Sequence, residues 1–177
     1  MNDVLYFAYG SNLLRERLAA RCKDASFQGV ATLADHRLIF DKPSRKDGSG
    51  KCGYVDCSGC HVWGVLWAMP ESMLFSLDRW EGAGFGYERT TLALTLPSGK
   101  LVQAVAYHQT ARQEGLPPFD WYRALVLAGA LQHGATDKYL ETIRSEPILV
   151  DSEFRRPDRL DAMGYLRAAG YEGLTDG

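Results

Sequence analysis

The sequence predicts a single α+β domain with a largely antiparallel or mixed sheet that can curl towards a barrel. Three observations carry this prediction. The 177 residues are the size of one domain, and a globule of this size can bury roughly 70% of its unfolded surface. Segments of strand composition dominate the early part of the chain, and helical segments dominate the later part. No repeat or linker divides the chain, so we expect one domain over residues 1–177.

The N-terminal segments predict a strand, a tight turn and a helix. Residues 3–10, DVLYFAYG, are β-branched and aromatic and end in glycine. In residues 11–22, SNLLRERLAARC, leucines recur at helical spacing behind two suitable N-cap residues. Residues 27–41, FQGVATLADHRLIFD, predict one or two strands. Residues 42–53, KPSRKDGSGKCG, predict a mobile surface loop because lysine, glycine and serine dominate them.

The later segments predict one more buried strand, a hairpin and several helices. HVWGVLWAM is a buried-strand pattern, and PESMLFSLDRWEG predicts a short helix that begins near Pro70 and has Gly82 as its C′ residue. The turn SGK joins two alternating runs into a hairpin over residues 87–110. The remaining helices are expected within residues 118–135, 136–146 and 159–170.

Composition gives no reason to expect a nucleic-acid or membrane partner. Hydrophobic residues make up 46% of the chain and charged residues 24%, and the formal net charge is -2. No window approaches the roughly 18 apolar residues of a membrane-spanning helix. The N-terminus carries an acidic residue, Asp3, and no apolar core of a signal peptide, so we expect a cytoplasmic protein.

A C-x-x-C-H pattern at residues 57–61 is typical of haem attachment, zinc sites or redox sites. A reducing cytosol argues against attached haem and against a disulfide between Cys57 and Cys60. Cys52, Cys57, Cys60 and His61 have the right atoms for zinc, but Cys60 and His61 are adjacent and would point to opposite faces of a strand. We therefore expect no metal and a turn that leads into the next core strand, with structural zinc as the alternative.

The first candidate for chemistry is the turn from Gly10 to Asn12. A strand that ends in glycine and turns into a helix directs the first free N–H groups of that helix at one point, and this geometry binds carboxylates or a developing oxyanion. The simpler interpretation is that Gly10 serves the turn and Asn12 caps the helix. No phosphate-loop pattern is present.

The second candidate is Glu81, near the end of the predicted helix. Met73, Leu77 and Glu81 are spaced by four residues, so the carboxyl group continues an apolar stripe. The negative end of the helix dipole and burial both raise the pKa of such a group, which suits general acid–base catalysis near neutral pH. The alternative is a rotated helix with Glu81 in solvent.

Three motifs together resemble the γ-glutamylcyclotransferase family. They are YFAYGSNLL at residues 6–14, VWGVLW at residues 62–67 and SLDRWEG at residues 76–82, and the similarity continues through residues 122–147. The resemblance covers most of the chain and implies a small mixed β-barrel with helices packed around it. The cysteine-containing insert before VWGVLW departs from the family pattern, and the tail after Pro147, from about residue 148, is hard to assign.

The resemblance implies a reaction and its residues. The α-amine of a γ-glutamyl amide attacks its own γ-carbonyl and releases 5-oxoproline, with no cofactor and Glu81 as the acid–base catalyst. The residues that would bind the γ-glutamyl substrate are Tyr6, Phe7, Ala8, Tyr9, Gly10, Ser11, Asn12, Tyr87, Tyr107 and Tyr122. A homodimer is left open. The alternatives are a non-catalytic module that binds a small acidic ligand, and a zinc-stabilised interaction protein that uses residues 52–61.

Overall fold

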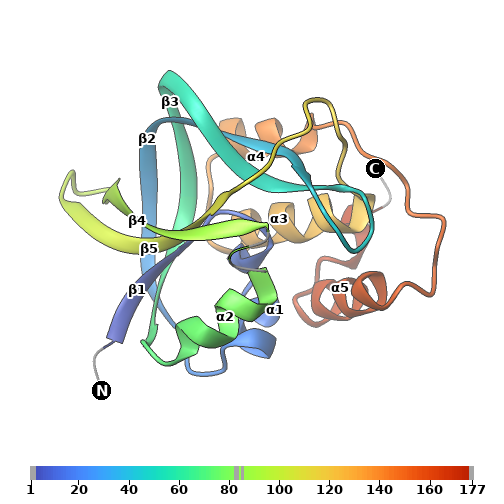
Figure 1. Cartoon of the computed structure of the whole chain (residues 1–177), viewed down its shortest axis with the longest axis horizontal. Coiled ribbons are helices and arrows are strands. Elements are labelled where there is room, and N and C mark those ends of the chain that lie inside the picture. Colours follow the sequence, from blue (N-terminus) through green and yellow to red (C-terminus); the bar gives the residue numbers. More distant parts are fainter. Residues whose placement is uncertain (1–2, 82–83, 85, 176–177) are drawn as a thin grey trace.

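The structure is a computed structural model that describes residues 3–81, 84 and 86–175; for Glu81 it describes the backbone only. Strands alternate with short helices in the first part, and helices fill the rest (Figure 1). The strands are β1 (Asp3–Ala8), β2 (Ser26–Pro43), β3 (Gly50–Pro70), β4 (Tyr87–Thr95) and β5 (Leu101–Gln109). The helices are η1 (Ser11–Leu13), α1 (Arg15–Arg21), α2 (Met73–Glu81), α3 (Asp120–Gln132), α4 (Asp137–Arg144), α5 (Pro157–Ala168) and η2 (Glu172–Thr175).

The described strands close into a barrel in the order β1-β3-β2-β4-β5. Neighbouring strands are antiparallel except at the closure, where Tyr6 of β1 pairs in parallel with Val105 of β5. Helices α3, α4 and α5 lie beside the barrel, and α1 and α2 lie near one end of it (Figure 1). The predicted α+β fold with a small mixed barrel is confirmed, and the predicted hairpin is β4 with β5.

The loop predicted over residues 42–53 is much shorter than expected, because most of its residues join strands. Pro43 still pairs with Gly50, so only residues 44–49 connect β2 to β3. Asp47 ties this connection together by accepting hydrogen bonds from Ser49 N at 3.0 Å and from Lys51 Nζ at 2.9 Å. The result is a long, bent hairpin that extends to the helical side of the molecule (Figure 1).

The helix predicted directly after Gly10 is wrong. Residues 11–13 form the 3-10 helix η1, Leu14 is extended with a ψ of 119°, and α1 begins only at Arg15. Neither Ser11 nor Asn12 caps a helix. Leu13 and Leu14 are both fully buried, and the extended conformation of Leu14 separates η1 from α1.

Helix α3 is the central helix of the fold. Every residue from Asp120 to Ala130 is buried. A Cβ on Gly129 would lie 2.4 Å from both Leu13 Cβ and Leu14 N, so only glycine lets α3 approach the turn after β1 this closely. The helix therefore fixes the position of that turn.

The expectation that Cys57 and Cys60 stay unpaired is wrong, because they form a disulfide bond. Between the pairs Ala34–His61 and His36–Asp56, four residues of β3 bulge opposite one residue of β2. Gly59 adopts a φ of 76° and donates its N–H to Asp35. The bulge brings the cysteine Cα atoms to 5.4 Å, inside the roughly 4.4–6.8 Å range of disulfides.

The C-terminal tail packs on α3. Ala162 and Leu166 of α5 are fully buried in the same core as the barrel residues. Asp151, which is 2% exposed, accepts hydrogen bonds from Trp121 Nε1 at 2.9 Å and from Arg156 Nε at 2.7 Å. None of the helices in the described ranges is long and apolar enough to span a membrane.

The Asp151 carboxylate predicts a pH-dependent contribution to stability. Burial raises its pKa, but hydrogen bonds from Arg156 and Trp121 outweigh burial and hold the pKa below its usual value. The stabilisation is therefore complete above the unfolded-state pKa of about 4 and is lost as the pH falls through the lower folded-state pKa. Asp151→Asn should lower the free energy of unfolding at pH 7 by about 1–3 kcal/mol.

Urea unfolding at pH 7 and near pH 3 measures this effect. The difference between wild type and Asp151→Asn should shrink at the lower pH, because the carboxyl group of the unfolded state is mostly protonated there and part of the stabilisation is already lost. Glu153→Gln is the control, because Glu153 also pairs with Arg156, at 3.0 Å, but is largely exposed. A difference that does not change with pH would contradict the role of the Asp151 charge.

Candidate active site

The turn after β1 forms one wall of a small cavity of about 30 Å³, called here the inner cavity. It lies where the barrel meets α3, because its other walls come from β3, β4, β5 and α3. The residues that line it are Tyr6, Tyr9, Gly10, Ser11, Asn12, Cys52, Tyr87, Tyr107 and Tyr122. The structure thus brings together most of the binding residues that the sequence analysis proposed.

Cys52 is the point where the cavity walls meet. Its backbone N–H donates to Tyr122 Oη at 3.1 Å, and its carbonyl accepts a hydrogen bond from Tyr87 Oη at 2.6 Å. Gly10 packs directly on this residue: a Cβ at Gly10 would lie 3.0 Å from Cys52 Cβ and 3.5 Å from Tyr122 Oη. Any side chain at position 10 would therefore crowd the cavity wall.

A second set of hydrogen bonds holds the turn to the barrel. Tyr9 donates its hydroxyl to the carbonyl of Tyr107. Asn12, which is buried, donates from Nδ2 to Tyr6 Oη at 3.0 Å and accepts at Oδ1 from Arg21 Nη1 at 2.9 Å. Asn12 thus links the turn, β1 and α1, instead of capping a helix.

Helix α2 reaches the cavity wall through Asp78, which bonds to Tyr107 of β5. Leu74 and Leu77 form its buried face, and position 81 lies on that same face by helical spacing, being four residues after Leu77. The predicted catalytic side chain, that of Glu81, lies outside the described residues, and so does the predicted C′ residue Gly82. Leu77 is buried as predicted, whereas Met73 is only half-buried.

Asp78 is a site residue that the sequence analysis missed. Its carboxylate accepts a hydrogen bond from Tyr107 Oη at 2.7 Å and one from Arg89 Nη1 at 3.2 Å. Asp78 therefore ties the last turn of α2 to the cavity wall. The sequence contained one indication of this role: Asp78 lies three residues before Glu81, which puts both residues on one side of a helix.

Two of the predicted binding residues lie outside the described cavity lining, and one residue that was not predicted to bind substrate lies within it. Among the described residues, Phe7 and Ala8 are not part of the cavity lining; they are 0% and 1% exposed in the barrel core. Cys52 does line the cavity, although the sequence analysis considered it only as a zinc ligand. Its approach to Gly10 joins segments that are far apart in the sequence, so no local pattern indicates it.

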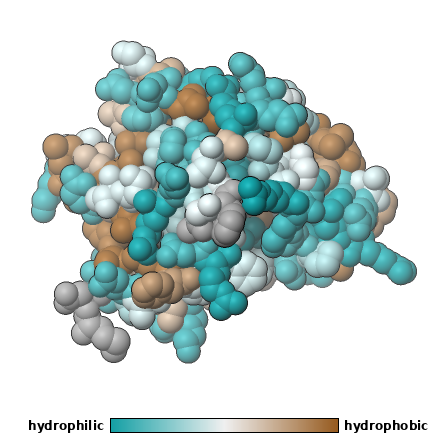
Figure 2. All heavy atoms as spheres, viewed as in Figure 1, coloured by the Kyte–Doolittle hydropathy of each residue, from teal (hydrophilic) through white to brown (hydrophobic). Residues whose placement is uncertain are grey.

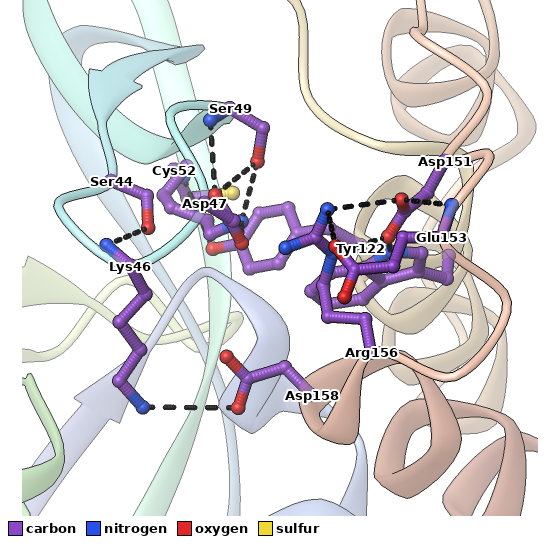
Figure 3. Close-up of polar contacts among 12 residues, drawn as sticks. Ser44, Lys46, Asp47, Ser49, Cys52, Tyr122, Asp151, Glu153, Arg156 and Asp158 are labelled. Atoms are coloured by element: carbon purple, nitrogen blue, oxygen red, sulfur yellow. Dashed lines mark hydrogen bonds and ion pairs between the residues drawn. The ribbon is translucent and has the colours of Figure 1, made fainter.

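A larger outer pocket, of about 220 Å³, adjoins the inner cavity and shares Ser11, Tyr87 and Tyr122 with it. The loop between β2 and β3, helices α1 and α2, and the start of α5 surround this pocket. Lys46 reaches from the loop towards Asp158 at the start of α5, with 3.7 Å between Nζ and Oδ1 (Figure 3).

Positive charge dominates the described lining of the outer pocket. Its cationic side chains are Arg17, Arg21, Lys42, Arg45, Lys46, Lys51 and Arg79, and its lining carboxylate is that of Asp158.

Burial lowers the pKa of Lys51, and nearby Asp47 opposes this shift. Burial raises the pKa of Asp47, but Lys51 outweighs it and the net shift is downward, as expected for an ion pair. On the face shown in Figure 2, hydrophilic side chains gather between α2, the β2–β3 loop and α5.

The proposed zinc ligands are not brought together. Cys57 and Cys60 are bonded to each other on the β3 bulge, and Cys52 is buried at the inner cavity. Within the described ranges, no group of three or more histidine, cysteine or acidic side chains could hold a metal ion. The structure therefore offers no support for the zinc-stabilised alternative.

Comparisons with known proteins agree with this geometry. The AIG2-like family model matches residues 61–143. The γ-glutamylcyclotransferases of Bos taurus and Homo sapiens are each 36% identical to this chain over 148 residues, which cover 81% of this chain and 78% of each relative. A solved structure titled γ-glutamyl cyclotransferase superposes with a TM-score of 0.84 at 30% identity, covering 92% of this chain and 99% of that one.

The resemblance that the three sequence motifs indicated is thus confirmed over most of the chain. Identity at this level, extending over four fifths of the sequence, establishes common descent as well as a common fold. The chain belongs to the γ-glutamylcyclotransferase family.

Proposed function

We propose that this protein is a γ-glutamylcyclotransferase that converts a γ-glutamyl amide into 5-oxoproline and a free amino acid or amine. The α-amine nitrogen forms a bond to the γ-carbonyl carbon, and the bond from that carbon to the leaving nitrogen breaks. The α-ammonium loses two protons as it becomes the lactam N–H, and the amide nitrogen gains two as it leaves as an ammonium group. The reaction therefore needs neither water nor an external nucleophile.

The observation that carries this proposal is one small cavity lined by tyrosines and by the turn from Tyr9 to Asn12, with α2 tied to its wall through the hydrogen bond from Tyr107 to Asp78. The tyrosine hydroxyl groups and the polar turn from Gly10 to Asn12 suit a small acidic ligand chemically. Family membership supports the same function, since the relatives named above are γ-glutamylcyclotransferases. The cytoplasmic location stays a prediction of the sequence.

The proposed binding residues divide by the part of the substrate that they contact. The N–H groups of Gly10, Ser11 and Asn12 hold the α-carboxylate or the oxyanion of the tetrahedral intermediate. Tyr6, Tyr9, Tyr87, Tyr107 and Tyr122 surround the γ-glutamyl chain and hold it folded. Folding the chain so that its amine approaches its own carbonyl lowers the barrier, because the two reacting groups belong to one molecule.

Glu81 is the proposed acid–base catalyst. It takes a proton from the α-ammonium, which makes the amine nucleophilic, and later gives a proton to the leaving nitrogen. Its position at the last residue of α2, on the face of Leu74 and Leu77, supports this role. Asp78 supports it as well, because its hydrogen bond with Tyr107 fixes the end of that helix against the cavity.

Replacing Glu81 tests both the function and the catalyst. Wild-type protein incubated with γ-glutamyl-alanine should release 5-oxoproline and alanine. Glu81→Gln should slow this release by about 10²–10⁴-fold, because the amide cannot transfer protons, while calorimetric binding of the dipeptide changes little.

Glu88→Gln is the matched control for Glu81→Gln, because Glu88 is an exposed carboxylate on β4. It should leave turnover unchanged. Retained turnover in Glu81→Gln would rule out Glu81 as the catalyst. Binding of γ-glutamyl-alanine without any 5-oxoproline from wild-type protein would favour the non-catalytic binding module instead.

Replacing Asp78 tests how the end of α2 is positioned. Asp78→Asn should reduce kcat/KM for γ-glutamyl-alanine by about 10- to 100-fold, because it removes charged hydrogen bonds of about 1.5–3 kcal/mol. Arg89→Gln removes only the more exposed ion pair and should cost less than about fivefold. Steady-state assays of both variants, with thermal unfolding as a check of folding, make the comparison. Equal effects would show that the Tyr107 contact has no special role.

A further inference from the structure

We infer that Cys57 and Cys60 form a reversible thiol–disulfide exchange site. A dithiol reductant opens their bond in the folded protein, and a low-molecular-weight disulfide such as glutathione disulfide closes it again. The C-x-x-C pattern of these residues has no part in the proposed function. Neither cysteine belongs to the described lining of the inner cavity or of the outer pocket, so the inference goes beyond that function.

The β3 bulge holds the two cysteines together through contacts that involve no sulfur atom. Strands β2 and β3 pair on both sides of the bulge. Within it, Gly59 donates its N–H to Asp35 Oδ1 at 2.9 Å. Beside it, His36 Nε2 lies 3.3 Å from Asp56 Oδ1. Opening the disulfide breaks none of these contacts, so the two thiols of the reduced protein stay close together and can bond again.

A small thiol can reach the disulfide in the folded chain. Cys57 and Cys60 are half-buried, and the two residues between them, Ser58 and Gly59, are exposed. Cys60 also lines the groove between the β2–β3 hairpin and α4, which has a volume of about 500 Å³. The rate of exchange depends on access of the attacking thiolate to a sulfur atom. The groove and the exposed bulge give this access without unfolding of the barrel.

The fold does not depend on this disulfide. Its cysteines are three residues apart in the sequence, and a disulfide that closes a short loop constrains the unfolded chain less than one that closes a long loop. The register of β2 and β3 is set by pairs that extend from Ser26–Ala68 to Pro43–Gly50. The described hydrophobic core contains neither cysteine. We therefore expect the reduced protein to keep its fold.

The exchange balances without a cofactor. A thiolate of the dithiol attacks one cysteine sulfur, which forms a mixed disulfide and releases the other cysteine as a thiolate. The second thiol of the reductant then attacks the mixed disulfide and releases the first cysteine. The protein gains two electrons and two protons, and the reductant loses the same number and becomes a disulfide. Glutathione disulfide reverses the reaction by the same steps and leaves as two glutathione thiols.

Alkylation of the folded protein tests the inference. Wild-type protein is treated with dithiothreitol and then with iodoacetamide, and its peptides are analysed by mass spectrometry. The dithiol should raise alkylation of Cys57 and Cys60 by at least about tenfold over untreated protein, because only a free thiolate is alkylated. Excess glutathione disulfide, added before the alkylation, should return it to the untreated level. Across mixtures of glutathione and glutathione disulfide, the alkylated fraction should rise gradually with the share of glutathione.

Cys22 is the internal control, because it is 1% exposed in the core. It should stay unalkylated with and without the dithiol, so its alkylation reports unfolding. The double variant Cys57→Ser, Cys60→Ser should keep the circular-dichroism spectrum of the wild type and show no dithiol-dependent alkylation.

The outcomes separate an exchange site from a purely structural disulfide. Reversible, dithiol-dependent alkylation with Cys22 unlabelled supports the inference. A bond that stays closed under dithiol in the folded protein, or that opens only together with alkylation of Cys22, overturns it. Free Cys57 and Cys60 that glutathione disulfide does not join overturn it as well. None of these measurements involves release of 5-oxoproline, so the proposed function is tested separately.

Discussion

The backbone of Cys52 is held from two sides by tyrosine hydroxyls, and the shape of the inner cavity depends on this arrangement. Tyr122 accepts from its N–H and Tyr87 donates to its carbonyl, so α3 and β4 fix the same peptide segment of β3. Gly10 then packs closely on Cys52, where a Cβ would lie only 3.0 Å from the cysteine Cβ. Cavity, barrel and central helix are therefore one structural unit.

This arrangement explains why the residues of the candidate site are so deeply involved in folding. Tyr6 is both a cavity residue and the point where β1 pairs with β5 to close the barrel. Gly129 lets α3 approach Leu13 and Leu14, and so places the same turn from the other side. The proposed substrate contacts and the core packing are carried by the same short segment. The outer pocket combines buried residues, such as Lys42 and Trp121, with the exposed Arg45 and Lys46 of the β2–β3 loop.

Local patterns were sufficient to predict the fold class and the hairpin of β4 with β5, and the resemblance to the family supplied most of the cavity lining. They failed where the conformation of a segment depends on contacts with residues that are far away in the sequence. The Lys- and Gly-rich segment at residues 42–53 has loop composition, yet pairing between β2 and β3 extends through most of it. Leu13 and Leu14 fit a helix by spacing, but both pack against Gly129 of α3, which is far away in the sequence, and Leu14 is extended. The contact of Cys52 with Gly10 and the disulfide of Cys57 with Cys60 likewise arise from close approach in the folded chain.

A crystal structure of the wild-type protein with bound 5-oxoproline tests the central claim most directly. The lactam should lie in the inner cavity, with its ring among the tyrosines and its carboxylate against the N–H groups of Gly10 to Asn12. The ring carbonyl should be near the end of α2, and the outer pocket should stay open for the leaving amino acid. A lactam bound elsewhere, such as in the groove between the β2–β3 hairpin and α4, would contradict the account.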